Sequence, residues 1–119
     1  MKTRAKRCTV KGQSIDPLKA PPHAPTQEKL ADGQNADHYV LCPEDRAKGY
    51  VEPYRESYVH EKCGVVTRMP RACAETYAAQ PEYYGSTFCC GCGGYFPVGE
   101  SGEFLWDGST QKVGTRKAA

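Results

Sequence analysis

The sequence predicts a small α+β domain, an antiparallel sheet of short strands with one short helix inserted between two pairs of metal-ligating residues. Three observations lead to this prediction. The two ligand pairs match in spacing, short β-rich runs flank each pair, and one alanine-rich run lies between them. Hydrophobic residues make up 39% of the 119 residues, beside nine prolines and twelve glycines. Because such a chain builds only a thin core, a bound metal is a reasonable source of stability.

Each ligand pair has two soft ligands separated by two residues, with a glycine directly after the second. The pairs are His60-Glu-Lys-Cys63-Gly64 and Cys89-Cys-Gly-Cys92-Gly93. A two-residue gap lets the chain turn so that both ligand atoms face one ion, and the glycine accepts the positive φ at the exit of the turn. Two such zinc knuckles facing each other complete a tetrahedral site. We therefore expect one structural Zn²⁺ held by His60, Cys63, Cys89 and Cys92.

The first 37 residues are predicted to form an extended or disordered arm. They lack hydrophobic periodicity, and the proline-rich run at 16–25 cannot sustain a helix or an internal strand. The arm begins with five cations and no acid in 15 residues: Lys2, Arg4, Lys6, Arg7 and Lys11. Residues 114–119 are predicted to be a flexible tail, so we expect the folded domain over 38–113.

Ordered sequence is predicted to begin with a short strand over 38–42, ended by Pro43, and a helical turn over 44–48. Tyr50, Tyr54 and Tyr58 recur at intervals of four, as on a helix face. Pro53 interrupts that pattern, so extended structure is an equal alternative. Strands are predicted over 58–60 and 65–69, on either side of the first knuckle.

The strongest helix prediction is the alanine-rich run 71–80, which lies between Pro70 and Pro81. Ala74, Tyr77 and Ala78 would share one face of it. Strands over 86–88 and 95–98 flank the second knuckle, and another follows over 102–106. Asp107-Gly108 predicts a hairpin that returns the chain to a last strand over 110–113.

The paired knuckles on predicted hairpins make residues 57–113 resemble the zinc ribbon. This resemblance implies two hairpins, each carrying one knuckle, with one or two further strands completing a small sheet. His60 stands where many ribbons have cysteine, which sites of the Cys₃His type accept. The runs Cys73-Ala-Glu-Thr-Tyr-Ala, Tyr84-Gly-Ser-Thr-Phe-Cys and Phe104-Leu-Trp-Asp-Gly are also similar to small uncharacterised bacteriophage and prophage proteins. That likeness implies a phage origin and brings no established activity.

Three further cysteines lie outside the ligand pairs: Cys8, Cys42 and Cys73. Cys73 is interpreted as a small core residue on the helix and Cys8 as a free thiol in the arm. His38 and Cys42 could instead form a second metal site with Cys8 or Cys73. Cys90 is expected to point away from the ion, because the two-residue gap uses its neighbours. The remaining alternative is that the knuckle cysteines are ordinary buried thiols and His60 is a surface residue, but the matched spacing favours ligation.

The cellular setting is predicted from the start of the chain and from its seven cysteines. No apolar stretch follows the basic first residues, so no secretory signal is recognised, and no segment is long enough to span a bilayer. We therefore expect a cytoplasmic protein without a disulfide framework.

Catalytic signatures of zinc enzymes are not met. A zincin needs histidine where Gly64 stands, and a nucleobase deaminase needs glutamate where Lys62 stands. Cys89-x-x-Cys92 does not open a helix of a βαβ unit, as a redox pair would. The sequence therefore predicts a non-enzymatic binding module.

Two kinds of partner are compatible with this module. A protein partner is suggested by aromatic residues that suit an interface or fill the core: Tyr83, Tyr84, Tyr95, Phe96, Phe104 and Trp106. A nucleic acid is suggested by the basic arm. Against the second, residues 58–113 carry four Lys or Arg and six Asp or Glu, a net charge of −2.

Overall fold

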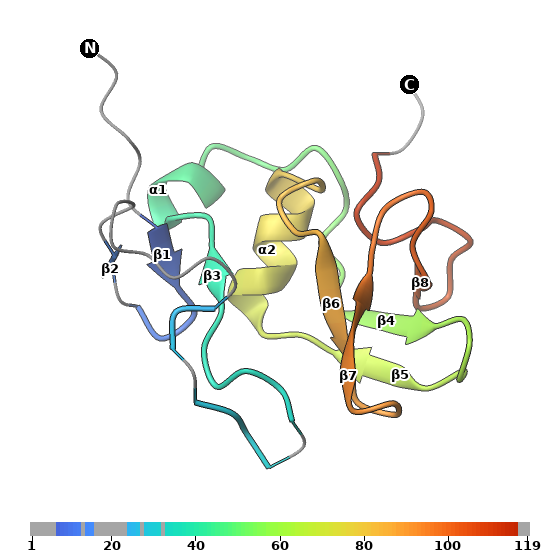
Figure 1. Ribbon diagram of the computed structural model, residues 1–119. Helices are drawn as coiled ribbons and strands as arrows, with labels where there is room; N and C mark the ends of the chain where they lie inside the picture. The colour runs from blue at the N-terminus through green and yellow to red at the C-terminus, as the bar shows by residue number, and fades with distance from the viewer. Residues whose placement is uncertain (1–6, 13, 16–23, 27, 32, 117–119) are drawn as a thin grey trace.

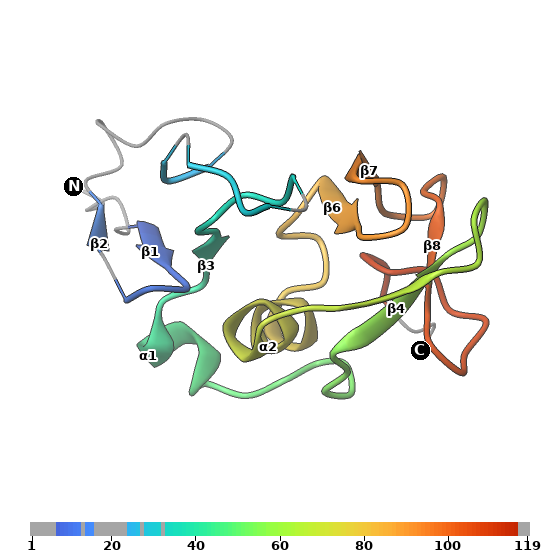
Figure 2. The same cartoon turned by 90° about the horizontal axis from the view of Figure 1, so that it is seen from below.

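A computed structural model describes residues 7–12, 14–15, 24–26, 28–31 and 33–116. The described part is a small α+β structure in which three antiparallel sheets surround a central helix, as predicted at this level (Figure 1). The central helix, α2, spans Arg71–Ala79. Two views agree that α2 lies between the N-terminal sheet and the sheet that contains β4 (Figure 2).

The N-terminal sheet has the strand order β2-β1-β3. It is formed by β1 (Arg7–Thr9), β2 (Ser14–Ile15) and β3 (Tyr39–Val40). Val10 extends the pairing by donating its backbone N–H to the His38 carbonyl at 2.9 Å. Both β1 and β2 lie in the segment that was predicted to be an extended or disordered arm. Part of this arm is therefore paired with β3, where ordered structure was predicted to begin. Residues 1–6 and 16–23 lie outside the described residues.

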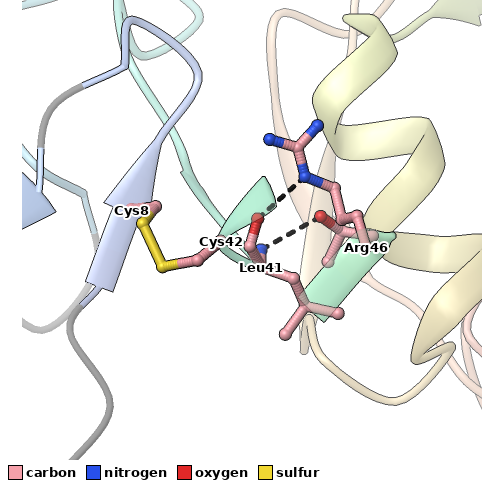
Figure 3. Close-up of a disulfide and its surroundings, with 5 residues drawn as sticks. Cys8, Leu41, Cys42 and Arg46 are labelled. Atoms are coloured by element: carbon pink, nitrogen blue, oxygen red, sulfur yellow. Dashed lines mark hydrogen bonds between the residues drawn. A yellow bond between two sulfur atoms is a disulfide. The ribbon is translucent and has the colours of Figure 1, made fainter. Parts of the chain in front are cut away.

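A disulfide joins Cys8 in β1 to Cys42, which lies beyond Leu41 after the end of β3, with an S–S distance of 2.07 Å (Figure 3). The interpretation of Cys8 as a free thiol is therefore wrong, and the second metal site of Cys8, Cys42 and His38 is not formed. Pairing of β1 with β3 brings the two Cα atoms to 5.1 Å, inside the usual disulfide range. Beside the bond, the Arg46 side chain donates to the Leu41 carbonyl at 2.9 Å.

The second sheet has the order β5-β4-β8, from β4 (Ser57–His60), β5 (Val66–Arg68) and β8 (Phe104–Trp106). The third is the hairpin of β6 (Ser86–Cys89) and β7 (Gly94–Pro97). The two knuckle hairpins thus belong to different sheets. The chain after the Asp107-Gly108 turn makes only a single bridge, between Leu105 and Lys112, where we predicted a strand. Val113 is nevertheless fully buried.

The helix predictions agree with the structure. The helix α1 is a single turn over Pro43–Arg46, and α2 ends one residue before the predicted end. The residues around Tyr50 and Tyr54 are not helical. The buried face of α2 includes Ala74, Tyr77 and Ala78, as predicted, together with Cys73. This face joins side chains of all three sheets in one hydrophobic cluster: Val40, Tyr58, Met69, Cys89, Phe104, Trp106 and Val113.

Within the described residues, neither helix has the length and apolar character needed to cross a membrane.

Candidate metal centre

The four predicted ligands lie at the turns of the two knuckle hairpins. The strand β4 ends at His60 and β6 ends at Cys89, so each turn begins with a ligand. In the first turn the Gly64 N–H donates to the His60 carbonyl at 2.7 Å, and in the second the Gly93 N–H donates to the Cys89 carbonyl at 2.8 Å. Gly64 has φ 73° and Gly93 has φ 70°. Both glycines therefore take the left-handed conformation predicted for them, which other residues adopt at a cost.

One ligand atom from each of His60, Cys63, Cys89 and Cys92 lies within 4.8 Å of the others. Cys63 Sγ is 3.4 Å from Cys89 Sγ, and Cys92 Sγ is 3.4 Å from His60 Nδ1. A tetrahedral ion with metal–sulfur bonds of about 2.3 Å requires sulfur–sulfur separations of roughly 3.8 Å. The four side chains are therefore close enough together for a metal site.

His60 is held in position from two sides. Its ring lies between Phe96 and Phe104, with centroids 4.7 Å apart and planes 28° apart in both pairs. Its Nε2 bonds Glu103 Oε1 at 2.8 Å, while Nδ1 faces Cys92. The other carboxylate oxygen of Glu103, Oε2, forms an ion pair with Lys62 Nζ at 3.3 Å. A carboxylate on the far nitrogen of a ligand histidine is the usual orientation device of metal sites, because it fixes the ring and the tautomer.

Sequence reasoning missed Glu103 because no spacing rule connects it to a knuckle. It lies one residue before β8, and β8 pairs with β4 so that Phe104 lies opposite His60. The contact between Glu103 and His60 thus depends on the register of two strands separated by more than 40 residues.

The electrostatics of the cluster favour a cation. A backbone hydrogen bond from Val65 lowers the pKa of Cys63 to about 7, with further contributions from the neighbouring thiols and His60. Burial, followed by the adjacent Cys63 and Cys89, raises the pKa of Cys92 to about 11. The neighbouring thiols thus favour ionisation of Cys63, whereas Cys63 and Cys89 oppose ionisation of Cys92. A divalent ion removes this conflict, since it pairs with several thiolates at once.

The remaining cysteines lie apart from this cluster. Cys90 points toward β5, where its Sγ is 3.3 Å from the Thr67 hydroxyl and its N–H donates to that hydroxyl at 3.1 Å. Cys73 is buried in the core, as predicted, and burial raises the pKa of its thiol to about 11.

The aromatic residues considered for an interface pack inward to different degrees. Phe104 and Trp106 are buried in the core, whereas Tyr83, Tyr84, Tyr95 and Phe96 are half-buried. Among the described side chains, the large apolar ones that are exposed are others: Leu30, Tyr50, Val51, Tyr54, Val65 and Val66. Of the basic arm, Lys2, Arg4 and Lys6 lie outside the described residues.

Comparisons of the chain with protein-family models, with curated proteins and with solved structures find no match.

Proposed function

We propose that the protein is a zinc-stabilised, non-enzymatic binding module that docks on a protein partner. The observation that carries the proposal is the convergence of one imidazole nitrogen and three sulfurs within 4.8 Å. Three thiolates and one imidazole suit Zn²⁺ better than the hard cations Mg²⁺ and Ca²⁺. Four protein ligands leave no coordination position for a substrate or a reactive water. The ion would therefore stabilise the fold without catalysing a reaction.

The likeness of residues 57–113 to the zinc ribbon fits this proposal, because each knuckle lies on a hairpin and β8 adds a further strand. The likeness of the C-terminal runs to phage proteins extends it to a phage-encoded factor whose partner is a host protein. We assign the factor to the inside of the cell, where zinc-bound thiolates are protected from oxidation; the Cys8–Cys42 disulfide, which persists best in an oxidising compartment, argues against this assignment.

A protein partner is favoured over a nucleic acid by two surface features. Val65 and Val66, next to the metal centre, are 37% and 45% exposed. Most cations of the described part already pair with carboxylates and so offer little free charge to phosphates: Arg46, Lys48, Arg55, Lys62, Arg68, Arg71, Lys112 and Arg116.

The metal assignment is tested by elemental analysis of the purified chain with two matched variants. We expect one zinc per chain, loss of zinc in Cys92→Ser, and retention in Cys90→Ser, because Cys90 is exposed but lies outside the cluster. Equal zinc content in both variants, or no metal in the native chain, would contradict the assignment.

The partner assignment is tested by capture from nuclease-treated host lysate. Val66→Asp places a charge beside the metal centre, and Val51→Asp places the same charge on another exposed valine as the control. We expect Val66→Asp alone to lose the captured protein. Salt-sensitive binding to random DNA that disappears in a Lys2, Arg4 and Lys6 to Gln variant would instead favour the nucleic-acid alternative.

A further inference from the structure

A cavity of about 1020 Å³ lies between the N-terminal sheet, α2 and the β6–β7 hairpin. None of the four residues of the metal centre lines it. Its volume is at the upper end of the range for sites that hold small molecules. The cavity is therefore a second candidate site, separate from the metal centre.

One part of the cavity wall belongs to the hydrophobic core. Several lining residues are members of the buried cluster around α2: Val40, Tyr58, Met69, Cys73 and Tyr77. Each of them is at most 7% exposed. They close the cavity on the side of the core, so the surface that a ligand contacts comes from other residues of the wall.

Three half-buried tyrosines present aromatic surface to the cavity, namely Tyr83, Tyr84 and Tyr95. The Tyr83 and Tyr84 rings meet edge to face, with centroids 4.8 Å apart. The Tyr84 hydroxyl donates to the Tyr39 carbonyl, and the Tyr95 oxygen accepts the Asn35 N–H at 3.1 Å. Because these bonds hold the rings in place, a planar aromatic ligand can pack against them at little entropic cost.

Lys29 adds a positive charge beside the Tyr95 ring. Its Nζ lies 5.9 Å from the centroid of that ring. Nζ bonds the neutral amide oxygen of Asn35 at 2.6 Å, and among the described residues no carboxylate forms an ion pair with it. An anion bound at this end of the cavity can therefore pair with Lys29 without breaking an existing salt bridge.

The other ionised side chains of the wall already have counter-charges. Arg68 pairs with Glu56, and Asp45 pairs with Lys48 at 3.0 Å. Burial lowers the pKa of His38, which favours its neutral form. Within the described wall, the charge that remains without a counter-charge is thus a single positive one. It matches a ligand with one negative charge.

We propose that this cavity binds a planar aromatic carboxylate, with its ring against the half-buried tyrosines and its carboxylate at Lys29. The inference goes beyond the proposed function, because it depends on neither the metal nor the protein partner. Contacts between rings supply the attraction, and the Lys29 ammonium selects the charge of the ligand.

The test is an NMR titration of the full zinc-loaded chain with three ligands of nearly equal size. We expect 2-naphthoate to bind at one site per chain. The amide 2-naphthamide lacks the charge, and decalin-2-carboxylate lacks the aromatic rings. Each should bind about fivefold more weakly, which corresponds to the loss of one solvent-accessible ion pair or of the contacts between rings. Absence of saturable binding by 2-naphthoate, or equally tight binding of either of the other two, would overturn the proposal.

Lys29→Met removes the charge of the anchoring residue and keeps a long side chain. It should lower the affinity for 2-naphthoate about fivefold and leave the affinity for 2-naphthamide unchanged. The matched control is Lys11→Met, at an exposed lysine that does not line the cavity, and it should change neither affinity. Equal losses in both variants would reflect net charge alone and would exclude Lys29 as the residue that binds the carboxylate.

Two further substitutions locate the site. Ser86→Trp introduces an indole at a residue that lines the cavity, and Ser101→Trp makes the same change at an exposed turn outside it. We expect Ser86→Trp alone to abolish binding of 2-naphthoate. Equal affinity in both variants would place the ligand outside the cavity.

Discussion

Glu103 shows how a single residue outside the ligand pairs organises the metal centre. Its carboxylate accepts a hydrogen bond from His60 Nε2–H and leaves Nδ1 directed at Cys92. Without it the ring loses the partner that fixes its tautomer. We expect Glu103→Gln to weaken zinc affinity by roughly 10–100-fold, as measured by chelator competition. Glu100→Gln, an exposed glutamate three residues earlier, is the matched control and should leave affinity unchanged.

His38 makes the stability of the chain depend on pH. Burial lowers its pKa, and the neighbouring Asp37 opposes this effect. Because the folded pKa lies below the unfolded value of 6.5, its contribution is present above that value and is lost as the pH falls through the folded pKa.

We therefore expect the wild type to lose stability relative to His38→Gln as the pH falls from 7.5 to 5.5. The relative change should be less than about 1.4 kcal/mol per pH unit, the limit for one proton. Urea midpoints of both proteins across this range provide the measurement. If the wild type became more stable relative to the variant as the pH falls, the folded protein would instead favour the charged form of His38.

At the level of elements, the disulfide ties β1 to the end of β3 across a sequence separation of 34 residues. The strands it joins are two and three residues long, so few ladder bonds hold them. A cross-link over a loop of this length stabilises a fold by about 4 kcal/mol, chiefly by restricting the unfolded chain. The attachment of β1 and β2 thus depends strongly on one covalent bond.

We expect the double variant Cys8→Ser with Cys42→Ser to lose about 4 kcal/mol of unfolding free energy, measured by urea denaturation with zinc present. A phosphine reductant should bring the wild type to the same midpoint and leave the variant unaffected. Cys90→Ser serves as the cysteine control, because that thiol is outside both the disulfide and the metal cluster. Identical midpoints for the wild type and the double variant would show that β1 is held by its other contacts.

For the molecule as a whole, one hydrophobic cluster connects the metal centre to the N-terminal sheet. Cys89 belongs both to the ligand set and to this cluster, and Val40 of β3 belongs to the same cluster. Within the described residues no sheet has a separate core of its own. Loss of the ion should therefore destabilise the fold beyond the two knuckles.

Chelation should therefore lower amide protection in β3 as well as in β4, β6 and β8, since apo ligands cannot offset the entropy of ordering these short strands. Hydrogen exchange with and without a chelator measures this, and readdition of zinc should restore protection. Full protection of Val40 in a metal-free chain whose β4 amides exchange freely would show two independent folding units instead.

Features with a local cause can be predicted from the amino-acid sequence alone. Each ligand pair lies within one turn, where residue spacing and the following glycine set the direction of both ligands. The helix α2 follows from its alanine content and its flanking prolines, and its buried face follows from helical spacing. The short strands beside the knuckles were located in the same way.

Contacts between distant segments, in contrast, become visible only in the folded chain. Pairing of β1 with β3 brings Cys8 to Cys42, and pairing of β4 with β8 brings Glu103 to His60. The pocket beside α2 is likewise lined by segments that are far apart in sequence, from Ala24 to Tyr95. Such long-range contacts cannot be predicted from a local sequence pattern. They depend on the packing of the whole core and on the loop closures that this packing makes favourable.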